Sequence, residues 1–340
     1  MVSSADAPDL LRFDEFMELA LYGPSGFYSS GGAAGRRGDF LTSPEVGPLF
    51  GAVVARAIDA EWRRQGSPGT FDVIDAGAGP GTLARSVLAA KCEAQRAGAL
   101  RYTCVEASAA QRERHPEGVV SVAEMPRRIE CGFVIANELF DNLPFRLAVW
   151  DGEWREAFVA EQSGRWVEVL IRLDEIPSVL PRHSVPLGSR APLQDRASQW
   201  LGSVLSSMGC GRVVVIDYCT GVTASLAMRP WREWLRTYRQ QQRGTHYLST
   251  PGSQDITAEV CIDQLALGVG EADAIRSQAQ WLQLWGIDEL VDEGRRWWEE
   301  KASAPDLRAM TGRSRVREAE ALCDPAGLGA FTVLEWVAGS

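Results

Sequence analysis

The sequence is poor in the residues that build metal centres and disulfide frameworks. Its 340 residues include only three histidines, which lie far apart in the chain and form no His-x-x-x-His arrangement. The seven cysteines are odd in number and contain no Cys-x-x-Cys pair. Neither a metal site nor a disulfide framework is therefore expected.

Long apolar runs are also missing. No stretch of 18 apolar residues occurs, so the sequence predicts no membrane-spanning helix. The first ten residues, MVSSADAPDL, lack the basic and apolar segments of a secretory signal. Together with the cysteine pattern, these features predict a reduced, cytoplasmic protein.

Positive charge is outnumbered by negative charge. Lys and Arg total 35 against 45 Asp and Glu, which gives a formal net charge of −10. Nucleic-acid binders are usually basic, and an acidic surface is repelled by anionic lipids, so we expect neither nucleic acid nor a membrane as partner. What is present is ordinary for a globular protein, with 45% hydrophobic and 24% charged residues. The length corresponds to one large domain or two of ordinary size.

The N-terminal region predicts two helices on either side of a glycine-rich loop. Residues 10–22 carry apolar side chains at helical spacing, and Gly23-Pro24 ends that pattern. The loop at 25–40 is either flexible or shaped to approach a ligand. Thr42-Ser43-Pro44-Glu45 then matches a capping box with a proline near the first turn. It predicts a helix whose apolar stripe runs over 46–58.

From residue 71 the periodicity changes to that of buried strands. Short apolar runs lie at 71–77, 101–107 and 132–138, and helical stretches at 83–97 and 107–114 separate or follow the first two. Strands that alternate with helices are typical of an α/β fold with a parallel sheet.

Further elements are predicted in the second half of the chain. Two alternating runs around Asp151-Gly152 indicate a β-hairpin. Residues 172–200 lack a clear period and predict a long excursion. We expect buried strands at 212–218 and 331–337 and a helical stretch over 274–301.

The main chemical signal is a glycine loop between a strand and a helix. The segment Asp75-Ala-Gly77-Ala-Gly79-Pro-Gly81-Thr82 follows the first buried run. Glycines let the backbone turn tightly and approach a ligand closely. The spacing is Gly-x-Gly-x-Gly, and Thr82 stands where the dinucleotide fingerprint has its last glycine. A tight turn with Asp75 as a helix cap would explain the loop on its own.

Glu106 adds a second feature, because it ends the next predicted strand. A carboxylate at that strand end can accept hydrogen bonds from both hydroxyls of a ribose. The glycine loop and Glu106 together indicate a nucleoside-bearing cofactor.

This order of strand, glycine loop, helix, strand and glutamate resembles class I S-adenosylmethionine-dependent methyltransferases. More narrowly, the chain resembles the MidA-like family, which includes the mitochondrial complex I assembly factor that methylates an arginine. The runs GDFLTSPE and ANELFDNLP are specific to that family. The similar stretches follow one another along most of the chain and are 16–28, 38–51, 75–84, 105–108, 136–145, 154–156, 216–218, 251–260 and 277–287.

The resemblance implies S-adenosyl-L-methionine as cofactor and an α/β fold with a seven-stranded, doubly wound, mostly parallel sheet that has one reversed strand. It implies an N-terminal helical lobe (1–66) that covers the site. The methyltransferase core (67–340) would carry a substrate-side insertion around 151–210 and a variable segment at 219–260. The residues expected to bind or close over the cofactor are Asp75, Gly77, Gly79, Gly81, Glu106, Asn137, Gly38, Asp39 and Thr42, although capping alone would explain Thr42.

Candidate catalytic carboxylates lie in the family-specific run after the strand at 132–138. A guanidinium is a poor nucleophile until it loses a proton, and carboxylates can grip its N–H groups bidentately. Glu138 is our candidate for this clamp, and Asp141 for a second carboxylate. Loop turns and helix capping are the alternatives for both. Asp255 is a further candidate, and Asn137 could bond the amino-acid end of the cofactor.

The chain departs from the family pattern in its substrate half. It has Gly221 to Leu226 where an Arg-Gly-Thr-Leu-Arg-like segment is expected, and Glu259 where a histidine is expected. Five arginines between 229 and 243 predict a solvated basic helix face. These differences leave the methyl acceptor open, although an arginine of a protein partner is our first expectation.

Three alternatives stay open at this stage. The chain could be a nicotinamide-type oxidoreductase on a similar sheet, which Thr82 argues against. It could be a non-catalytic assembly protein that keeps the fold, or it could methylate a small molecule. The sequence does not determine the oligomeric state.

Overall fold

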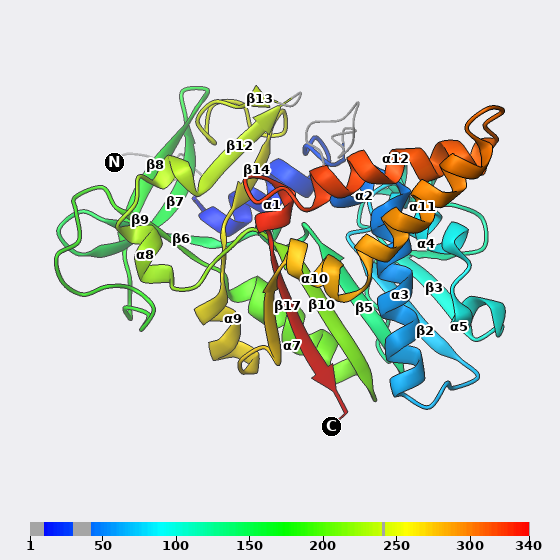
Figure 1. The fold of residues 1–340 in the computed structure, drawn as a ribbon. Coiled ribbons are helices and arrows are strands. Elements are labelled where there is room, and N and C mark those ends of the chain that lie inside the picture. The colour runs from blue at the N-terminus through cyan, green and yellow to red at the C-terminus, as the bar shows by residue number, and fades with distance from the viewer. Residues whose placement is uncertain (1–9, 30–41, 240–241, 340) are drawn as a thin grey trace, which may run out of the picture. The chain divides into compact units, whose positions relative to one another are not determined.

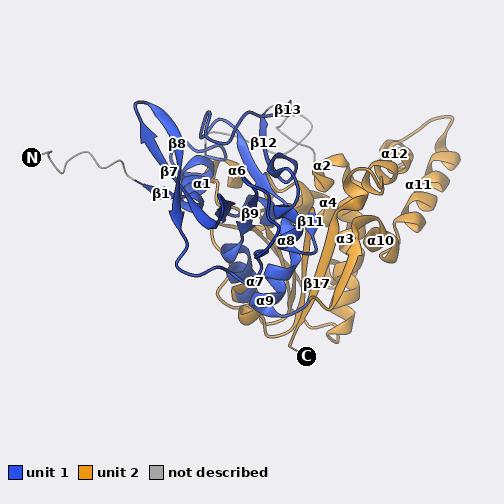
Figure 2. Cartoon of the chain, turned by 90° about the vertical axis from the view of Figure 1, so that its left-hand side faces the viewer, with its two compact units in different colours: residues 1–32, 140–202, 219–271 blue, residues 33–139, 203–218, 272–340 orange. Residues whose placement is uncertain are grey.

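The computed structural model describes residues 10–29, 42–239 and 242–339. The chain divides into two compact units, shown in Figure 2. Unit 1 comprises Met1–Gly32, Phe140–Gly202 and Cys219–Glu271, and unit 2 comprises Ala33–Leu139, Ser203–Tyr218 and Ala272–Ser340. The helical lobe expected at 1–66 is thus shared between the two units, because its described residues up to 29 belong to unit 1 and those from 42 onward to unit 2.

Unit 2 is built on a mixed β-sheet (Figure 1). In the described part of the chain this sheet contains seven strands, in the order β16-β17-β10-β5-β2-β3-β4. The neighbours from β10 to β4 pair in parallel, whereas β17 runs antiparallel to both β10 and β16. The strands are β2 (Phe71–Ala76), β3 (Leu100–Val105), β4 (Val120–Val122), β5 (Gly132–Asn137), β10 (Gly211–Asp217), β16 (Ala274–Ser277) and β17 (Thr332–Ala338). The predicted α/β fold and its main buried strands are confirmed.

The helices of unit 2 bury the apolar side chains that the strands present on one face. Phe71 and Val73 of β2 join one core cluster with Val53 of α3, Val87 of α4 and Trp281 of α10. All five are almost inaccessible to solvent, which is where most of the stabilisation of such a layered fold arises. The helices are α2 (Ser43–Val46), α3 (Pro48–Arg64), α4 (Thr82–Ala90), α5 (Glu93–Arg96), α6 (Ala109–Arg112), α10 (Gln278–Leu284), α11 (Ile287–Lys301) and α12 (Leu307–Leu322).

The helix predicted after Thr42 is broken in two at Gly47. The backbone of Gly47 is extended, and α3 starts anew at Pro48. The carboxylate of Glu318 accepts a hydrogen bond from the backbone N–H of Leu49 at 2.8 Å and so caps the new helix. A Cβ on Gly47 would collide with that carboxylate. The break therefore has a tertiary cause, contributed by α12.

Unit 1 contains smaller sheets around its own core. Strands β1, β7, β6 and β9 form a path with β8 paired to β7, and β13-β12-β14 and β11-β15 form two further sheets. The elements are β1 (Leu11–Arg12), α1 (Phe13–Tyr22), β6 (Arg146–Trp150), β7 (Trp154–Gln162), β8 (Arg165–Arg172), β9 (Arg190–Leu193), β11 (Cys219–Thr220), α8 (Thr223–Ala227), β12 (Leu235–Arg239), β13 (Gln242–Arg243), β14 (Asp255–Ala258), β15 (Val260–Cys261) and α9 (Ile262–Val269). Helix α7 (Asp195–Ser207) starts in unit 1 and ends in residues assigned to unit 2. The predicted hairpin around Asp151-Gly152 is confirmed as β6 and β7.

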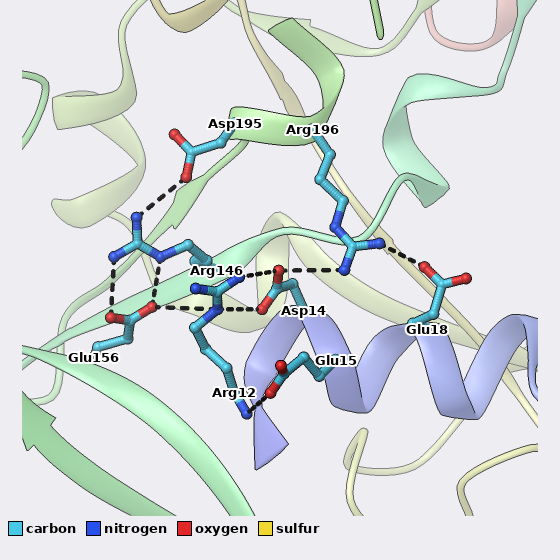
Figure 3. Close-up of polar contacts among 8 residues, drawn as sticks. All are labelled: Arg12, Asp14, Glu15, Glu18, Arg146, Glu156, Asp195 and Arg196. Carbon is cyan, nitrogen blue, oxygen red and sulfur yellow. Dashed lines mark hydrogen bonds and ion pairs between the residues drawn. The ribbon is translucent and has the colours of Figure 1, made fainter. Parts of the chain in front are cut away.

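Ion pairs fix α1 against neighbouring elements of unit 1 (Figure 3). The guanidinium of Arg146 on β6 pairs with Glu156 on β7 at 2.6 Å and with Asp195 at 3.2 Å. Arg196, the next residue of α7, reaches Asp14 of α1 at 3.4 Å. Because Asp14 is buried, its carboxylate depends for stability on Arg196 and on Arg12, which lies 2.6 Å away. The network is structural and fixes the position of the N-terminal helix within unit 1.

Three sequence-based predictions are wrong in detail. The arginine-rich segment at 229–243 forms a short 3-10 turn and the strands β12 and β13, not a helix. The stretch at 274–301 begins with strand β16 before its helices. The stretch at 172–200 is not wholly irregular, because it contains β9 and the start of α7. The sequence analysis also did not anticipate β8 and α12.

Candidate active site

The glycine loop follows β2 at the carboxyl end of the parallel strands in unit 2. Gly77, Gly79 and Gly81 have φ values of 70°, 51° and 78°, a region that favours glycine. A Cβ would lie 3.0 Å from Leu139 at the first position and 2.9 Å from Pro116 at the third. A Cβ on Gly79 would meet no described atom within 4 Å. The loop is thus closely packed at both ends and open at its centre, as a ligand-binding turn requires.

Glu106 is held against this loop at the end of β3. Its Oε2 accepts a hydrogen bond from the Gly79 N–H at 2.9 Å, and its Oε1 accepts one from the Ser108 N–H at 2.8 Å. Burial is the main cause that raises the pKa of Glu106, and the two backbone donors oppose it. Each carboxylate oxygen has a second lone pair. The side chain is therefore oriented and can still accept further hydrogen bonds.

His115 also contacts the loop, which the sequence analysis did not anticipate. Its Nε2 lies 2.9 Å from the Gly79 carbonyl oxygen, and its Nδ1 lies 2.8 Å from the Ser121 hydroxyl. Burial is the largest cause that lowers the pKa of His115. A neutral ring with one N–H can donate to the Gly79 carbonyl. His115 thus supports the loop.

Asp75 lies beneath the loop. Its carboxylate is buried and accepts a hydrogen bond from the Tyr102 hydroxyl at 3.2 Å. Burial raises the pKa of Asp75 to about 7, and the negative charge of Glu106 adds to the shift. A protonated Asp75 could coexist with an ionised Glu106 at neutral pH. No helix-capping bond from Asp75 occurs, because the α4 N-cap is Gly81 and has no side-chain cap.

Glu138 follows β5 at the same edge of the sheet. It has a left-handed backbone with φ 53°, and its N–H donates to the Ile216 carbonyl at 2.8 Å. The carboxylate Oε1 accepts from the Asn137 side-chain amide at 3.2 Å and from the Ser43 N–H at 3.3 Å. A left-handed backbone at a residue other than glycine costs about 1–3 kcal/mol and occurs preferentially at functional sites.

The segment before α3 contacts this edge but forms no capping box. The Thr42 side chain makes no helix cap, so that prediction is wrong. The Glu45 carboxylate instead accepts a hydrogen bond at 2.5 Å from the hydroxyl of Thr82, the first residue of α4. Ser43 uses its N–H for Glu138. The predicted residues Gly38 and Asp39 lie outside the described residues.

Asp141 and Asp255 are buried together in unit 1. The Thr257 hydroxyl donates to Asp141 Oδ2 at 2.6 Å. Asp255 Oδ1 accepts from the Tyr28 hydroxyl at 3.1 Å and from the Asn142 side-chain amide at 3.0 Å. Burial raises the pKa of Asp255 to about 7, and the neighbouring Asp141 charge adds to the shift. These carboxylates form a separate cluster in unit 1, whereas Glu138 is held within unit 2.

Glu259, the residue found where a histidine was expected, is part of an ion-pair cluster. Arg229 donates two hydrogen bonds to its carboxylate, at 2.9 and 2.8 Å, and Arg236 lies 3.4 Å away. Within the described residues, no cluster of three His, Cys, Asp or Glu side chains is arranged to hold a metal ion. In the same described part, no helix is long and apolar enough to cross a membrane.

Comparison with known proteins finds similarities that extend over most of the chain. Residues 53–279 match the sequence model of a family described as "Putative S-adenosyl-L-methionine-dependent methyltransferase". A Drosophila melanogaster relative, named Protein arginine methyltransferase NDUFAF7 homolog, mitochondrial, is 30% identical over an alignment of 283 residues. The match covers 72% of this chain and 63% of that protein. The chain therefore spans less than two thirds of that relative. The Xenopus tropicalis NDUFAF7 protein is 24% identical, over 82% of this chain and 72% of its own.

Solved structures show the same similarity over nearly the whole chain. A Burkholderia thailandensis protein with bound S-adenosyl-homocysteine is 26% identical. It has a TM-score of 0.80 and covers 97% of this chain and 88% of its own. A native structure from the same organism has a TM-score of 0.78 with the same identity and coverage.

Proposed function

This chain belongs to the family of S-adenosyl-L-methionine-dependent methyltransferases, and from that premise we propose that it methylates an arginine side chain of a protein. The family model covers more than half of the chain. The relatives named protein arginine methyltransferases support a protein arginine as the acceptor. The observation that carries the proposal is the position of Glu138, a carboxylate held at the carboxyl edge of the sheet on a strained backbone.

The residues of unit 2 fit S-adenosyl-L-methionine, the cofactor of the family. A Cβ built on Gly79 would have no described atom within 4 Å, so the loop backbone at this position is accessible to a ligand. Glu106 is oriented to accept from the two ribose hydroxyls. The Asn137 Oδ1 is buried and has no hydrogen-bond partner in the described structure. An unpaired buried acceptor costs about 1–3 kcal/mol, so a donor such as the ammonium of the amino-acid end fits there.

Bound cofactor supplies a methyl group on a positively charged sulfonium. The protein must hold the acceptor nitrogen in line with that methyl group, and orientation of this kind accounts for much of the rate. A carboxylate at Glu138 can accept N–H bonds from the guanidinium and keep its positive charge away from the attacking nitrogen. We assign this role to Glu138, because Asn137 and Ser43 fix its carboxylate.

The finer points of the fold and setting are also proposals. We assign the sheet of unit 2 to the doubly wound class I arrangement, which the strand order and the single reversed strand β17 support. Unit 1 contains most of the predicted insertion and the whole variable segment, so we assign substrate recognition to it. We keep the cytoplasmic location as a proposal, although the animal relatives are named mitochondrial.

The substitution Glu138→Gln tests this role. It keeps the size of the side chain and removes its charge, so methyl transfer should fall about 10²-fold, which is about 2.7 kcal/mol of transition-state stabilisation. Transfer from labelled cofactor to protein is measured beside Asp141→Asn, for which a smaller loss is expected. Cofactor affinity should hardly change. Equal turnover of Glu138→Gln and wild type would remove Glu138 from the mechanism.

A further inference from the structure

A small basic cavity in unit 1 is not explained by methyl transfer itself. It has a volume of about 220 Å³ and lies between the 3-10 turn Trp231–Glu233, strand β12 and residues 243–247. Of the ten described residues that line it, Arg232, Arg236, Arg243 and His246 are basic and none is acidic. The chain as a whole carries a net charge of −10. A concentration of arginines without acids is therefore a local feature of this cavity.

Two of these arginines have no carboxylate partner in the described part of the chain. Neither Arg232 nor Arg243 forms an ion pair within residues 10–29, 42–239 and 242–339; Arg243 donates to the Arg232 carbonyl at 3.2 Å. Arg236 lies 3.4 Å from Glu259, but that carboxylate already receives two hydrogen bonds from Arg229. As far as the described residues go, the positive charge of the cavity is not fully compensated by carboxylates.

The acidic side chain that contacts Tyr247 in the cavity wall is already neutralised. Glu168 pairs with Arg190 at 2.5 Å and accepts a hydrogen bond from the Tyr247 hydroxyl at 2.7 Å. The pKa of His246 is lowered, first by burial and then by the positive charges of Arg190 and Arg232, which outweigh the opposing effect of Glu168. The positive charges of Arg190 and Arg232 therefore act on the His246 ring in the cavity wall.

Aromatic rings hold the cationic groups in place. Arg232 stacks over the Trp231 ring at 4.4 Å, and Arg190 lies 5.2 Å from the same ring. His246 and Tyr247 also pack edge-on against Trp231. A guanidinium that stacks on an aromatic face keeps its N–H edge available for a bidentate contact with an oxyanion. The Arg232 guanidinium is thus oriented before any ligand arrives.

The volume restricts the ligand. Pockets for drug-sized molecules usually measure about 300–1,000 Å³, so this cavity suits one side chain better than a nucleotide. We propose that the cavity receives an oxyanion-bearing side chain, a carboxylate or a phosphorylated hydroxyl, of the protein substrate. This inference rests on the proposed function, because it takes the methyl acceptor to be a protein. It assigns a docking role to the segment in which the chain departs from its family pattern.

Calorimetric titration with three short peptides of otherwise identical sequence tests the proposal. Their central residues are two glutamates, a phosphoserine or two glutamines. The full-length protein should bind at least one of the two anionic peptides at least about tenfold more tightly than the glutamine peptide. That preference should weaken with added salt. The pair of anionic peptides distinguishes carboxylate from phosphate as the source of the oxyanion.

The double variant Arg232→Gln/Arg243→Gln should lose the preference for anionic peptides. Its affinity for the anionic peptide that wild type prefers should be at least about tenfold lower than that of wild type. The matched control is Arg313→Gln, because Arg313 is also exposed and stacks on a tryptophan, Trp298, at 4.6 Å. It should bind as wild type does. A cooperative thermal transition in each variant shows that it is folded.

Equal binding of all three peptides, no binding of either anionic peptide, or unchanged affinity of the folded double variant would each overturn the docking proposal. The proposed function fails in a different way. If wild type binds an anionic peptide through Arg232 and Arg243 but methylates no protein, the cavity assignment stands and the methyl acceptor is wrong.

Discussion

Removal of the Glu106 carboxylate should weaken cofactor binding more than any other single change at the ribose end of the site. In the structure its two oxygens already accept backbone N–H bonds, at 2.9 Å from Gly79 and 2.8 Å from Ser108. Each oxygen can accept one more bond, and two ribose hydroxyls supply two donors. Glu106→Ala therefore removes two charged hydrogen bonds to the cofactor and also releases the loop.

A hydrogen bond to a charged group contributes about 1.5–3 kcal/mol. Water in the vacated space recovers part of this energy, so we expect a loss of at least about 1.4 kcal/mol, or tenfold in affinity. Glu106→Gln keeps one acceptor oxygen and should fall between wild type and Glu106→Ala. This order follows from the number of charged acceptors.

The assay is calorimetric titration with S-adenosyl-L-methionine in the absence of a methyl acceptor. Glu113→Ala is the matched control, because Glu113 is exposed and lies in the same strand-to-strand connection. A thermal transition measured on each variant separates a binding defect from unfolding. If folded Glu106→Ala binds within about twofold of wild type, Glu106 does not contact the ribose and the assignment of the site is wrong.

Two further changes test the loop and the buried acids. Gly79→Val should abolish cofactor binding in a folded protein, because its side chain would project into the open centre of the loop at a φ of 51°; unchanged affinity by calorimetry would contradict this. Asp255 has an ordinary pKa of 3.8 and a folded value of about 7, so the folded state keeps a proton that the unfolded chain loses between these values. Stability from this group is full below about pH 4 and declines as the pH rises to about 7. Asp255→Asn should remove that decline. The free energy of unfolding of each protein is measured by denaturant titration from pH 4 to 8, and the value for the variant minus the value for wild type should rise with pH. A difference that does not change with pH would refute the buried-acid assignment.

The parts of the site with local signals could be predicted from the sequence. The run at 71–76 is apolar at Phe71, Val73 and Ile74 before Asp75. The three glycines that follow have left-handed backbones, which a tight turn requires. Glu106 and Glu138 follow apolar strands, so their place at the carboxyl edge follows from parallel pairing. Here local propensity and tertiary structure agree.

The parts of the site that depend on residues far away in the chain could not be predicted from the sequence. His115 contacts the Gly79 carbonyl from 36 positions away, and no pattern around it marks that contact. Thr82, 37 positions from Glu45, takes the carboxylate that a capping box would have used. A local cap contributes about 1 kcal/mol, so a tertiary hydrogen bond is enough to displace it.

The strand within 229–243 could have been recognised from its alternating pattern. Arginines at helical spacing suggested a helix, but Leu235 and Thr237 are buried while Arg236 between them is only half-buried. This alternation with a period of two is that of a strand, and β12 pairs with β14 accordingly. The charged residues concealed a short apolar pattern.

The central claim is that this chain transfers a methyl group to a protein arginine. Wild type and Glu138→Gln are incubated with methyl-labelled S-adenosyl-L-methionine and host lysate, and the protein fraction is then hydrolysed to amino acids. The account predicts label in methylated arginine with wild type and about 10²-fold less with the variant. Label confined to small molecules or to another amino acid, or no transfer by a wild type that binds the cofactor, would contradict it.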